Sequence, residues 1–249
     1  MSKIKKYIVQ SSTMGNLVIK RVSKKKAKEL IVENHYSHKW NNASFGLGNY
    51  GIFREGREDE SECLGVAVYG YMKNVKAKIY THPDPKATML ELNRMWISDE
   101  LGKNAETILI SRSLKLLRED YPHCVAVQSF ADGRLGCGTI YKASNFKYYG
   151  KHQTIFLRNK RTGEVTHRQN LTNSTSRSIY VRENVAFLLK DFEIFKVDTY
   201  RYIYPFCKRF KFKTAEKPYP PYNKGTYPCD WVRDKEKIKQ NLIKMIAEI

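Results

Sequence analysis

A strand, a glycine-rich turn and a short helix follow one another in the segment 124–146, and this succession constrains the fold more than any other feature of the chain. The apolar run Cys124–Phe130 predicts a buried strand, and Thr139–Phe146 predicts a helix. The turn between them holds three glycines and one acid, Asp132. In open α/β sheets, ligands bind just beyond the carboxyl ends of the strands. The segment therefore predicts an α/β fold with a ligand site at this turn.

The glycine-rich turn admits two interpretations. Glycines before a helix let backbone N–H groups approach an anion, but a tight strand-to-helix connection also needs glycine for its own dihedral angles. Asp132 would repel a phosphate in such a cradle. A carboxylate at this place suits a general base, a metal ligand or an acceptor for an exocyclic amine. We therefore expect Asp132 to be catalytic.

The remaining elements alternate in a recognisable order. Strands are predicted over 17–22, 44–53, 63–71, 89–97 and 199–206, helices over 23–34 and 105–121, and a hairpin over 154–168. Strand, helix, three strands, helix, strand, helix and strand is the order of the acetyltransferase-type (GNAT) α/β fold, an analogy at the level of the fold alone. We expect a GNAT-like α/β (α+β) fold in which a central mixed, mostly antiparallel sheet is flanked by helices. Further along, the sequence predicts a polar loop over 170–178, a short helix over 184–190 and a terminal helix over 229–249.

The charge of the chain is strongly positive. Its 249 residues hold 45 Lys and Arg against 25 Asp and Glu, a net charge of +20. Residues 1–28 hold nine basic side chains and no acid, and residues 201–217 hold six basic side chains and one acid. Such a field favours a polyanion, although a soluble basic protein or a ribosome-associated one would carry it too. We expect contact with nucleic acid.

The basic residues near the C-terminus alternate with aromatic residues. Lys208–Lys213 follows three tyrosines of a predicted strand, and cations beside rings suit phosphates and bases. The alternative is a sheet edge with protective lysines and core aromatics. The candidate DNA-binding residues are Arg201, Lys208, Arg209, Lys211 and Lys213. We accordingly divide the chain into a GNAT-like catalytic core, 1–160, and a basic extension, 161–249, that packs on the core and contacts DNA.

Two histidines and a tyrosine lie together where the first predicted helix ends. His35, Tyr36 and His38 offer two imidazoles and a phenol within four residues, and histidine is the usual proton carrier near neutral pH. His35, His38 and Asp132 would also make a set of two histidines and one carboxylate for a metal such as iron. The alternative is one histidine satisfied in the core and one exposed histidine.

The loop before the second helix is a candidate cofactor site. In GNAT folds the amides of this loop hold the pyrophosphate of coenzyme A. Here Gly102, Lys103, Asn104 and Ala105 form the loop, and Arg94 or Lys103 would supply positive charge. The loop lacks the usual run of glycines, so it fits acetyl-CoA or a related acyl donor less well than a typical member, and an ordinary surface turn with a helix cap is the alternative.

Cysteine usage and hydropathy indicate a cytoplasmic protein. The five cysteines are widely spaced without a CxxC pair, so neither a zinc knuckle nor a disulfide framework is predicted. No apolar run approaches 18 residues, so we expect no membrane span. No motif fixes the oligomeric state, and a homodimer is compatible with the sequence.

Several of these motifs together resemble the Mom DNA-modification proteins of bacteriophages. The resemblance runs over about residues 17–215 and is carried by the segments 34–38, 91–98, 103–106, 131–132 and 138–146. It implies a GNAT-like fold and an enzyme that replaces a hydrogen of adenine N6 in double-stranded phage DNA with a carbamoylmethyl group, which protects the DNA from restriction in the host cytoplasm. It also implies roles for His35, Tyr36 and Asp132, an acyl-CoA-type donor and an iron requirement.

Adenine chemistry agrees with that resemblance. The amine of adenine N6 is a poor nucleophile because its lone pair is delocalised into the ring, and an enzyme must extrude the base or work at its major-groove edge. Asp132 would accept a proton from N6, and Tyr36, Tyr141 or Tyr149 would stack on the base. Two rival functions stay open: a GNAT N-acetyltransferase acting on a protein or small amine, and a DNA-binding protein without catalysis.

Overall fold

The computed structural model describes residues 5–11, 14–73, 79–167 and 192–225, together with Gln240, Ile243 and Ala247. The predicted loop 170–178, the predicted helix 184–190 and most of the predicted terminal helix lie outside the described residues. The chain forms two compact units. The first unit takes residues 1–129, 139–150 and 201–219, and the second takes 130–138, 151–200 and 220–249. Each unit therefore draws on both sides of residue 160.

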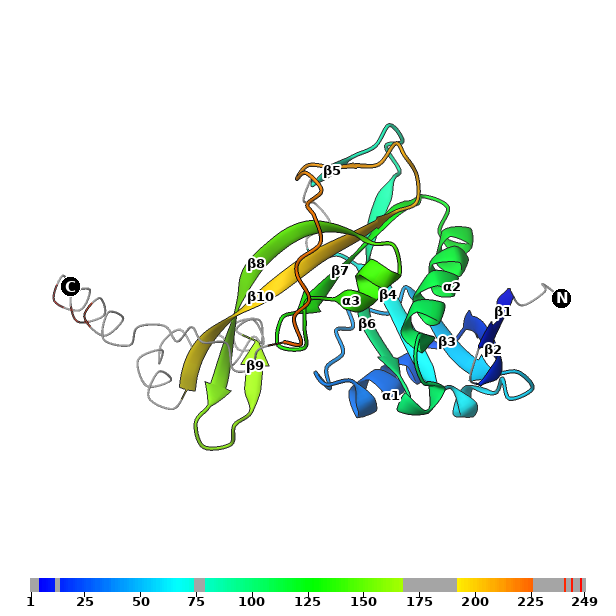
Figure 1. The fold of residues 1–249 in the computed structure, drawn as a ribbon, viewed down its shortest axis with the longest axis horizontal. Helices are drawn as coiled ribbons and strands as arrows, with labels where there is room; N and C mark the ends of the chain where they lie inside the picture. Colours follow the sequence, from blue (N-terminus) through cyan, green and yellow to red (C-terminus); the bar gives the residue numbers. More distant parts are fainter. Residues whose placement is uncertain are drawn as a thin grey trace. The chain divides into compact units, whose positions relative to one another are not determined.

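The first unit is built on a mixed sheet (Figure 1). Its strands are β1 (Lys6–Ser11), β2 (Gly15–Arg21), β3 (Gly48–Arg54), β4 (Gly65–Tyr71), β6 (Thr88–Ile97) and β7 (Cys124–Asp132), followed by the inner parts of β10 (Phe192–Pro205) and β8 (Lys147–Asn159), in the order β1-β2-β3-β4-β6-β7-β10-β8. Pairing from β1 through β6 is antiparallel, and β6 pairs with β7 in parallel. The predicted α/β fold with a mixed, mostly antiparallel sheet is confirmed.

Local turns explain where this sheet differs from its prediction. Gly15 has a φ of 71° and lets β1 fold back on β2, a hairpin that the sequence did not predict. The strand predicted from Ser44 begins only at Gly48, because Gly46, with a φ of 84°, turns the chain before it. The charged segment after β3 contains a short 3-10 helix, Glu60–Glu62, and leads into β4.

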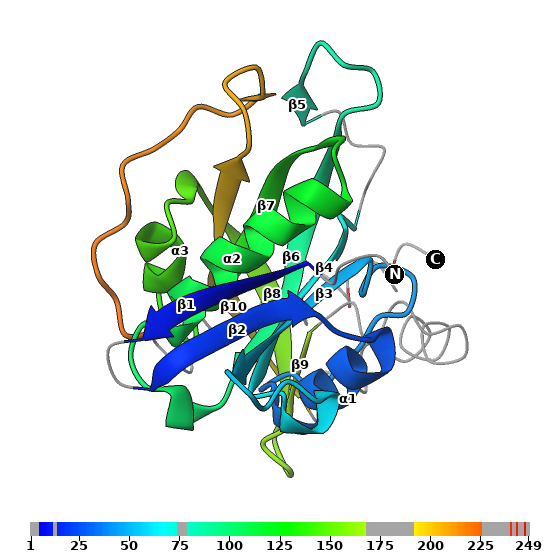
Figure 2. The same cartoon turned by 90° about the vertical axis from the view of Figure 1, so that its right-hand side faces the viewer.

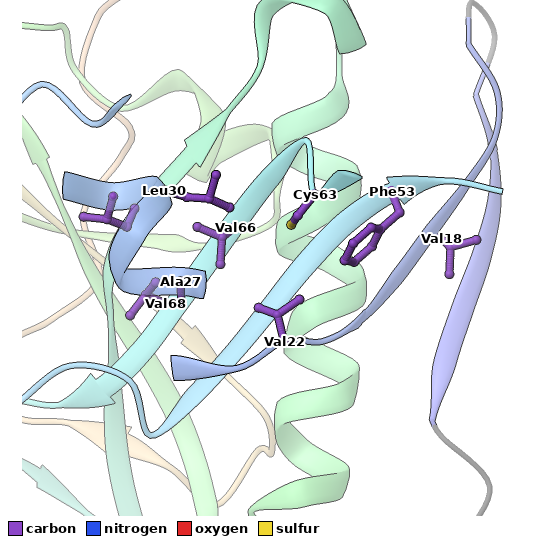
Figure 3. Close-up of a cluster of buried hydrophobic side chains, with 9 residues drawn as sticks. Val18, Val22, Ala27, Leu30, Phe53, Cys63, Val66 and Val68 are labelled. Carbon is purple, nitrogen blue, oxygen red and sulfur yellow. The ribbon is translucent and has the colours of Figure 1, made fainter. Parts of the chain in front are cut away.

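Helices cover both faces of the sheet. Helix α1 (Lys24–Asn34) begins where the Ser23 hydroxyl accepts a hydrogen bond from the Lys26 amide, and it buries the predicted stripe of Ala27, Leu30 and Ile31. The stripe packs on Val22, directly after β2, on Phe53 of β3 and on Val66 and Val68 of β4 (Figure 3). Burying each large side chain of this kind contributes about 1.5–3 kcal/mol.

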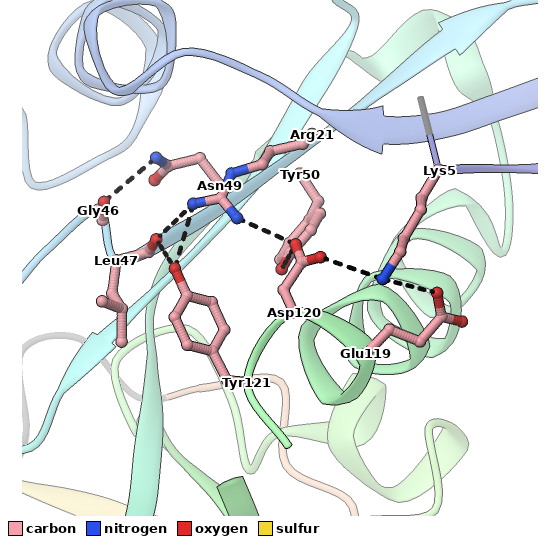
Figure 4. Close-up of polar contacts among 9 residues, drawn as sticks. All are labelled: Lys5, Arg21, Gly46, Leu47, Asn49, Tyr50, Glu119, Asp120 and Tyr121. Atoms are coloured by element: carbon pink, nitrogen blue, oxygen red, sulfur yellow. Dashed lines mark hydrogen bonds and ion pairs between the residues drawn. The ribbon is translucent and has the colours of Figure 1, made fainter. Parts of the chain in front are cut away.

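Helix α2 (Ala105–Asp120) follows a 3-10 turn, Asp99–Leu101, and lies on the opposite face (Figure 2). The hydroxyl of Tyr69 lies 2.7 Å from that of Ser113 in α2, whereas the neighbouring Val68 packs on α1, and successive strand residues point to opposite faces. At the end of α2, Asp120 accepts hydrogen bonds from Tyr50 (2.9 Å) and Arg21 (3.0 Å) (Figure 4). These bonds tie the helix to β2 and β3.

A register shift in β6 decides which of its side chains share a face. Val68 pairs with Arg94, but the next residue of β4, Tyr69, pairs with Leu92, so Asn93 is an extra residue, a β-bulge. Strict alternation along β6 would place Arg94 on the face opposite Glu91. The extra residue shifts the alternation by one and turns Arg94 to the α1 face with Glu91.

Strands β6 and β7 pair over only a few residues. Their parallel pairing ends at Glu91 opposite Gln128. Beyond β7, helix α3 (Thr139–Ala143) is shorter than predicted, because Asn145 takes a left-handed backbone with a φ of 62°. A second, two-stranded sheet pairs β5 (Tyr80–Thr81) with β11 (Lys211–Phe212).

The second unit holds the outer parts of β8 and β10 and the short strand β9 (Val165–His167). Strand β9 pairs with β8 in the predicted hairpin, with Phe156 opposite His167, and Gly163 allows the turn with a φ of 70°. Phe156, Phe195 and Val197 form its apolar core. In neither unit is a described helix long and apolar enough to cross a membrane.

Candidate active site

A carboxylate lies at the point where β6 and β7 stop pairing. Glu91 is half-buried, and its carboxylate accepts hydrogen bonds from the side-chain amides of Gln128 (2.7 Å) and Asn93 (3.1 Å). Burial raises the pKa of Glu91, while these bonds and the charges of Arg94 and Arg201 act in the opposite direction. A partly desolvated carboxylate with a raised pKa suits proton transfer near neutral pH.

Two arginines flank this carboxylate. The guanidinium of Arg94 donates to the Asn93 carbonyl (2.6 Å) and lies 4.8 Å from the centre of the Phe45 ring. Arg201, on β10, lies 5.5 Å from the ring centre of Phe212. Burial lowers the pKa of both arginines, and Glu91 opposes that effect. The cluster is therefore one acid between two partly desolvated cations.

His35 is neutral and held in one tautomer. It is 8% exposed, and burial, aided by Arg94 and His38, lowers the pKa of His35 to about 4. Its Nδ1 accepts a hydrogen bond from the Ser37 amide (3.1 Å) and lies 2.8 Å from the Ser37 hydroxyl. Because Nδ1 is the acceptor, the neutral ring carries its proton on Nε2. His35 can thus donate a hydrogen bond through Nε2 to a carbonyl oxygen of a substrate.

Tyr36 lies beside His35 with its ring exposed. The two ring centres are 4.2 Å apart, and Tyr36 is 52% exposed. The Tyr36 phenol and the Glu91 carboxylate both raise the pKa of Arg94, and Arg94 lowers the pKa of His35. Arg94 therefore links the His35–Tyr36 turn to Glu91 electrostatically. An exposed ring above a fixed imidazole is a surface on which a nucleobase can stack.

Asp132 belongs to the second unit and is engaged by a neighbour. Its carboxylate accepts hydrogen bonds from the backbone amide and from Nε of Arg134, both at 3.0 Å. The Arg134 guanidinium in turn lies 4.1 Å from the ring centre of Phe156. Any proton transfer by Asp132 would therefore compete with this ion pair.

The glycines around Asp132 are needed by the turn itself. A Cβ at Gly133 would lie 2.4 Å from the Asp198 carbonyl oxygen, and Gly136, with a φ of 124°, would meet the Asn223 carbonyl oxygen at 2.9 Å. Both positions lack room for any side chain. Of the two interpretations of this turn, the close packing of a tight connection accounts for the glycines.

The proposed iron ligands do not form a metal site. Over the described ranges, no three His, Cys, Asp or Glu side chains gather in a group that could hold a metal ion. Nδ1 of His38 lies 2.9 Å from the Val32 carbonyl, Nδ1 of His35 is bonded to Ser37, and Asp132 is paired with Arg134. The cation Arg94 beside His35 would also repel a metal ion. These residues do not fit iron.

The loop before α2 forms a hollow of about 520 Å³. Gly102 and Asn104 have positive φ values of 66° and 68°, and the Asn104 side chain makes no cap bond to the helix. The first amides of α2 therefore need another acceptor, such as an anion. Lys103 lines the hollow, but so do the acids Asp99 and Glu106. Arg94 is absent from this lining and lies in the Glu91 cluster instead.

Tyr149 and the basic segment 208–213 lie around a different core. Tyr149 is half-buried with its ring centre 5.0 Å from that of Phe212, and burial raises the pKa of its phenol. Phe210 is 7% exposed, so this aromatic residue belongs to the core, as the sheet-edge alternative held. The basic residues of the segment point to solvent: Lys208, Arg209, Lys211 and Lys213.

Glu91 and Gln128 were not predicted as functional residues from the sequence. The signal was present, because an acid inside an otherwise apolar strand, 89–97, must find polar partners when it is buried. The partners themselves could not be predicted, since they depend on the parallel register of β6 with β7 and on the bulge at Asn93.

Comparison with known families gives one match that spans the site. A model of the Mom protein family matches residues 16–221. The methylcarbamoylase Mom of Escherichia phage Mu is 34% identical over 205 residues, which are 78% of this chain and 79% of that protein.

Solved structures of acetyltransferases are similar at low identity. Arabidopsis thaliana NAA60 in complex with a bisubstrate analogue has a TM-score of 0.48 at 11% identity, over 76% of this chain and 97% of that one. The ribosomal-protein-S5-alanine acetyltransferase from Vibrio fischeri has a TM-score of 0.43 at 8% identity, over 82% of this chain and 98% of that one.

Proposed function

The chain belongs to the Mom protein family, and from this premise we propose that it is an enzyme that modifies adenine N6 in phage DNA. The observation that carries the proposal is the extent of the match. Residues 16–221 include the whole acid–arginine cluster, from His35 through Glu91 and Arg94 to Arg201. By analogy with its phage Mu relative, named a methylcarbamoylase, we propose a carbamoylmethyl group as the one transferred and double-stranded DNA in the host cytoplasm as the substrate.

The proposed reaction forms two bonds and breaks two. N6 of adenine bonds to the donor carbon, and the bond from that carbon to its leaving group breaks, with the electron pair going to the leaving group. One N6–H bond breaks, and its proton bonds to a carboxylate of the protein. We assign the proton to the ionised Glu91 carboxylate, because its raised pKa brings it closer to neutral pH. Asp132, held by Arg134, is the second candidate for this role.

Residues of the His35–Tyr36 turn, which follows α1, would hold the two reactants. The exposed ring of Tyr36 would stack on the extruded adenine, and extrusion costs a few kcal/mol that this contact helps to offset. The Nε2 proton of His35 would bond the carbonyl oxygen of the transferred group. Arg94, between them and Glu91, would keep the carboxylate ionised and attract a negatively charged donor.

The donor of a carbamoylmethyl group would carry its leaving group on the methylene carbon and would contain the amide nitrogen of that group, which the acetyl group of acetyl-CoA lacks. The amides at the start of α2, which the Asn104 side chain does not cap, and Lys103 suit a phosphate group, and a coenzyme A derivative of this kind would supply one. Asp99 and Glu106 at the same hollow would oppose a highly charged donor, so this assignment needs its own binding measurement with coenzyme A.

Mass spectrometry of nucleosides tests the proposed function directly. DNA from cells that express the protein should contain a new adenosine derivative that is missing from cells expressing a Glu91→Gln variant. Unchanged adenosine in the presence of folded protein would overturn the proposal. Acetylation of protein or small amines by the same preparation would instead support the N-acetyltransferase rival.

A further inference from the structure

A second hollow lies on the first unit, along helix α2 and away from the Glu91 cluster. It has a volume of about 560 Å³ and runs between α2 and the end of α3, with Tyr204 and Phe206 of the β10 end on its wall. Three cations of α2 line it: Arg112, Lys115 and Arg118. No acidic residue belongs to its described lining. We call it the α2–α3 groove.

The acids of the same helix are held on the other side. Asp120 accepts hydrogen bonds from Tyr50 and Arg21, and Glu119 pairs with Lys5 (3.7 Å) (Figure 4). Glu119 also accepts a hydrogen bond from the Tyr7 hydroxyl (2.7 Å). Although Glu119 lies one turn after Lys115, these partners on β1 to β3 engage it. These contacts with β1 to β3 engage both acids, and neither of them is among the residues that line the groove.

The three groove cations lack neutralising partners. Among the described residues, no carboxylate lies within ion-pair distance of Arg112, Lys115 or Arg118. Lys115 and Arg118 have only ring contacts, with Tyr7 (5.8 Å) and Phe206 (5.9 Å). The buried Arg112 Nε and the buried Ser144 hydroxyl on the facing wall also have no hydrogen-bond partner in the described part of the chain. Buried polar groups of this kind are normally satisfied, so a ligand or an ordered water is the expected partner.

The spacing of the cations suits a row of phosphates rather than a single one. Arg112, Lys115 and Arg118 follow at intervals of three residues, so they lie along one side of the helix over about 9 Å. One strand of duplex DNA advances about 3.4 Å along the duplex axis per phosphate, so a row of this length suits more than one phosphate. Beyond Arg118 the row reaches Phe206, which lies two residues before the exposed Lys208 and Arg209.

We propose that the α2–α3 groove binds the phosphodiester backbone of DNA. This inference rests on the proposed function insofar as DNA is the substrate. The groove lies on the α2 face of the sheet, whereas Glu91 and His35 lie on the α1 face, so it acts as a docking site that holds the duplex outside the reacting centre. Contacts of this type give affinity and register without reading sequence.

Salt-dependent binding tests the groove with a matched control. The groove variant is Lys115→Glu with Arg118→Glu, and the control is Lys25→Glu with Lys28→Glu, two exposed lysines of α1. Both pairs lower the net charge by the same amount. We expect the groove variant, compared with the control, to bind a labelled duplex at least about tenfold more weakly and to reduce the salt slope by about two, one for each phosphate that the substituted side chains no longer neutralise.

Equal affinities and equal slopes for the two variants would overturn the inference. A nucleoside diphosphate serves as a second probe. If the groove variant no longer binds this compound but keeps its affinity for DNA, the groove binds a nucleotide and the assignment to DNA is wrong. If the glutamate variant does not give the wild-type unfolding curve, Lys115→Gln with Arg118→Gln replaces it, with Lys25→Gln and Lys28→Gln as its control.

The outcome is separable from that of the proposed function. Groove-dependent DNA binding by a wild-type protein that produces no modified adenosine would refute the proposed function alone. If modified adenosine is formed and the groove substitutions leave DNA binding unchanged, only the assignment of the α2–α3 groove as a DNA site is refuted.

Discussion

Burial at the end of the β6–β7 pairing removes part of the water that would surround the carboxyl group of Glu91. Two side-chain amides and two arginine charges compensate for that loss. Burial raises the pKa of the Glu91 carboxyl, so this group accepts a proton more readily than an exposed carboxylate does. Its chemistry therefore depends on residues from three separate strands, β6, β7 and β10.

Replacing Glu91 should remove most of the activity. We expect Glu91→Gln to lower the rate of adenine modification by about 10²–10⁴-fold, the usual contribution of a general base. The wild-type rate should rise with pH through the raised pKa of Glu91, because only the ionised form accepts a proton. The measurement is the yield of modified adenosine per unit time across pH.

Two further variants make the assignment to Glu91 decisive. Glu62→Gln changes an exposed glutamate of the Glu60–Glu62 turn and should leave the rate unchanged. Asp132→Asn tests the other carboxylate. If Asp132→Asn abolishes modification and Glu91→Gln does not, the proton acceptor is Asp132 and our assignment fails.

His35 should make the fold sensitive to acid. Its folded pKa of about 4 lies below the value of 6.5 expected in the unfolded chain. The contribution of neutral His35 to the free energy of unfolding is therefore fully present above pH 6.5. It is lost as pH falls toward 4, and the loss is at most about 3 kcal/mol. Urea unfolding at pH 7 and pH 4.5 should show His35→Asn losing less stability than the wild type over this interval.

His38 provides the control for that experiment. It is exposed and has a φ of 47°, a backbone that asparagine tolerates, so His38→Asn keeps the local geometry. We expect His38→Asn to stay close to the pH dependence of the wild type, with only a small change, because His38 is the last and smallest of the three causes that lower the pKa of His35. A His35→Asn curve parallel to the wild type would show that burial of this imidazole is not linked to stability.

At the scale of elements, the contact of β4 with the loop before β3 positions the site. Gly70, opposite Glu91 in the register, lies so close to this loop that a Cβ would be 1.8 Å from the Ser44 carbonyl oxygen and 2.6 Å from the Asn93 side-chain oxygen. Phe45, which supports Arg94, follows Ser44 directly. The missing side chain of Gly70 thus lets the loop approach the bulge of β6.

Gly70→Ala should therefore be costly. We expect it to lower the free energy of unfolding by about 3 kcal/mol or more and to reduce activity, because the loop and Arg94 must move. Gly15→Ala is the matched control: its φ is 71° but its Cβ would have open space, so only about 1–2 kcal/mol of backbone strain is expected. Equal losses in urea unfolding would show that the loop yields freely to the methyl group.

At the scale of the whole molecule, the net charge of +20 should dominate association with DNA. We expect the logarithm of the binding constant for duplex DNA to fall with the logarithm of salt concentration, with a slope of about −0.9 per phosphate contacted. Fluorescence anisotropy over a salt series measures this slope. A flat response would mean that the positive field is not used for DNA, against the proposed substrate.

The sequence by itself determined the main secondary-structure elements and the excess of positive charge. The stripe of Ala27, Leu30 and Ile31 fixed α1, and the apolar run at Cys124 with its glycines fixed β7 and the turn. These features depend on periodicity and turn chemistry, which are properties of neighbouring residues. The resemblance to the Mom family rested on short motifs of the same local kind.

Only the tertiary structure decided which side chains meet. The bulge at Asn93 brings Glu91 and Arg94 to one face, and Arg134 forms an ion pair with Asp132. Phe210 turns inward while its basic neighbours face solvent. Strand register, ion pairing and burial are settled by residues distant in the chain, because each depends on a partner surface that local periodicity does not specify. The elements follow from the sequence, and the site follows from their packing.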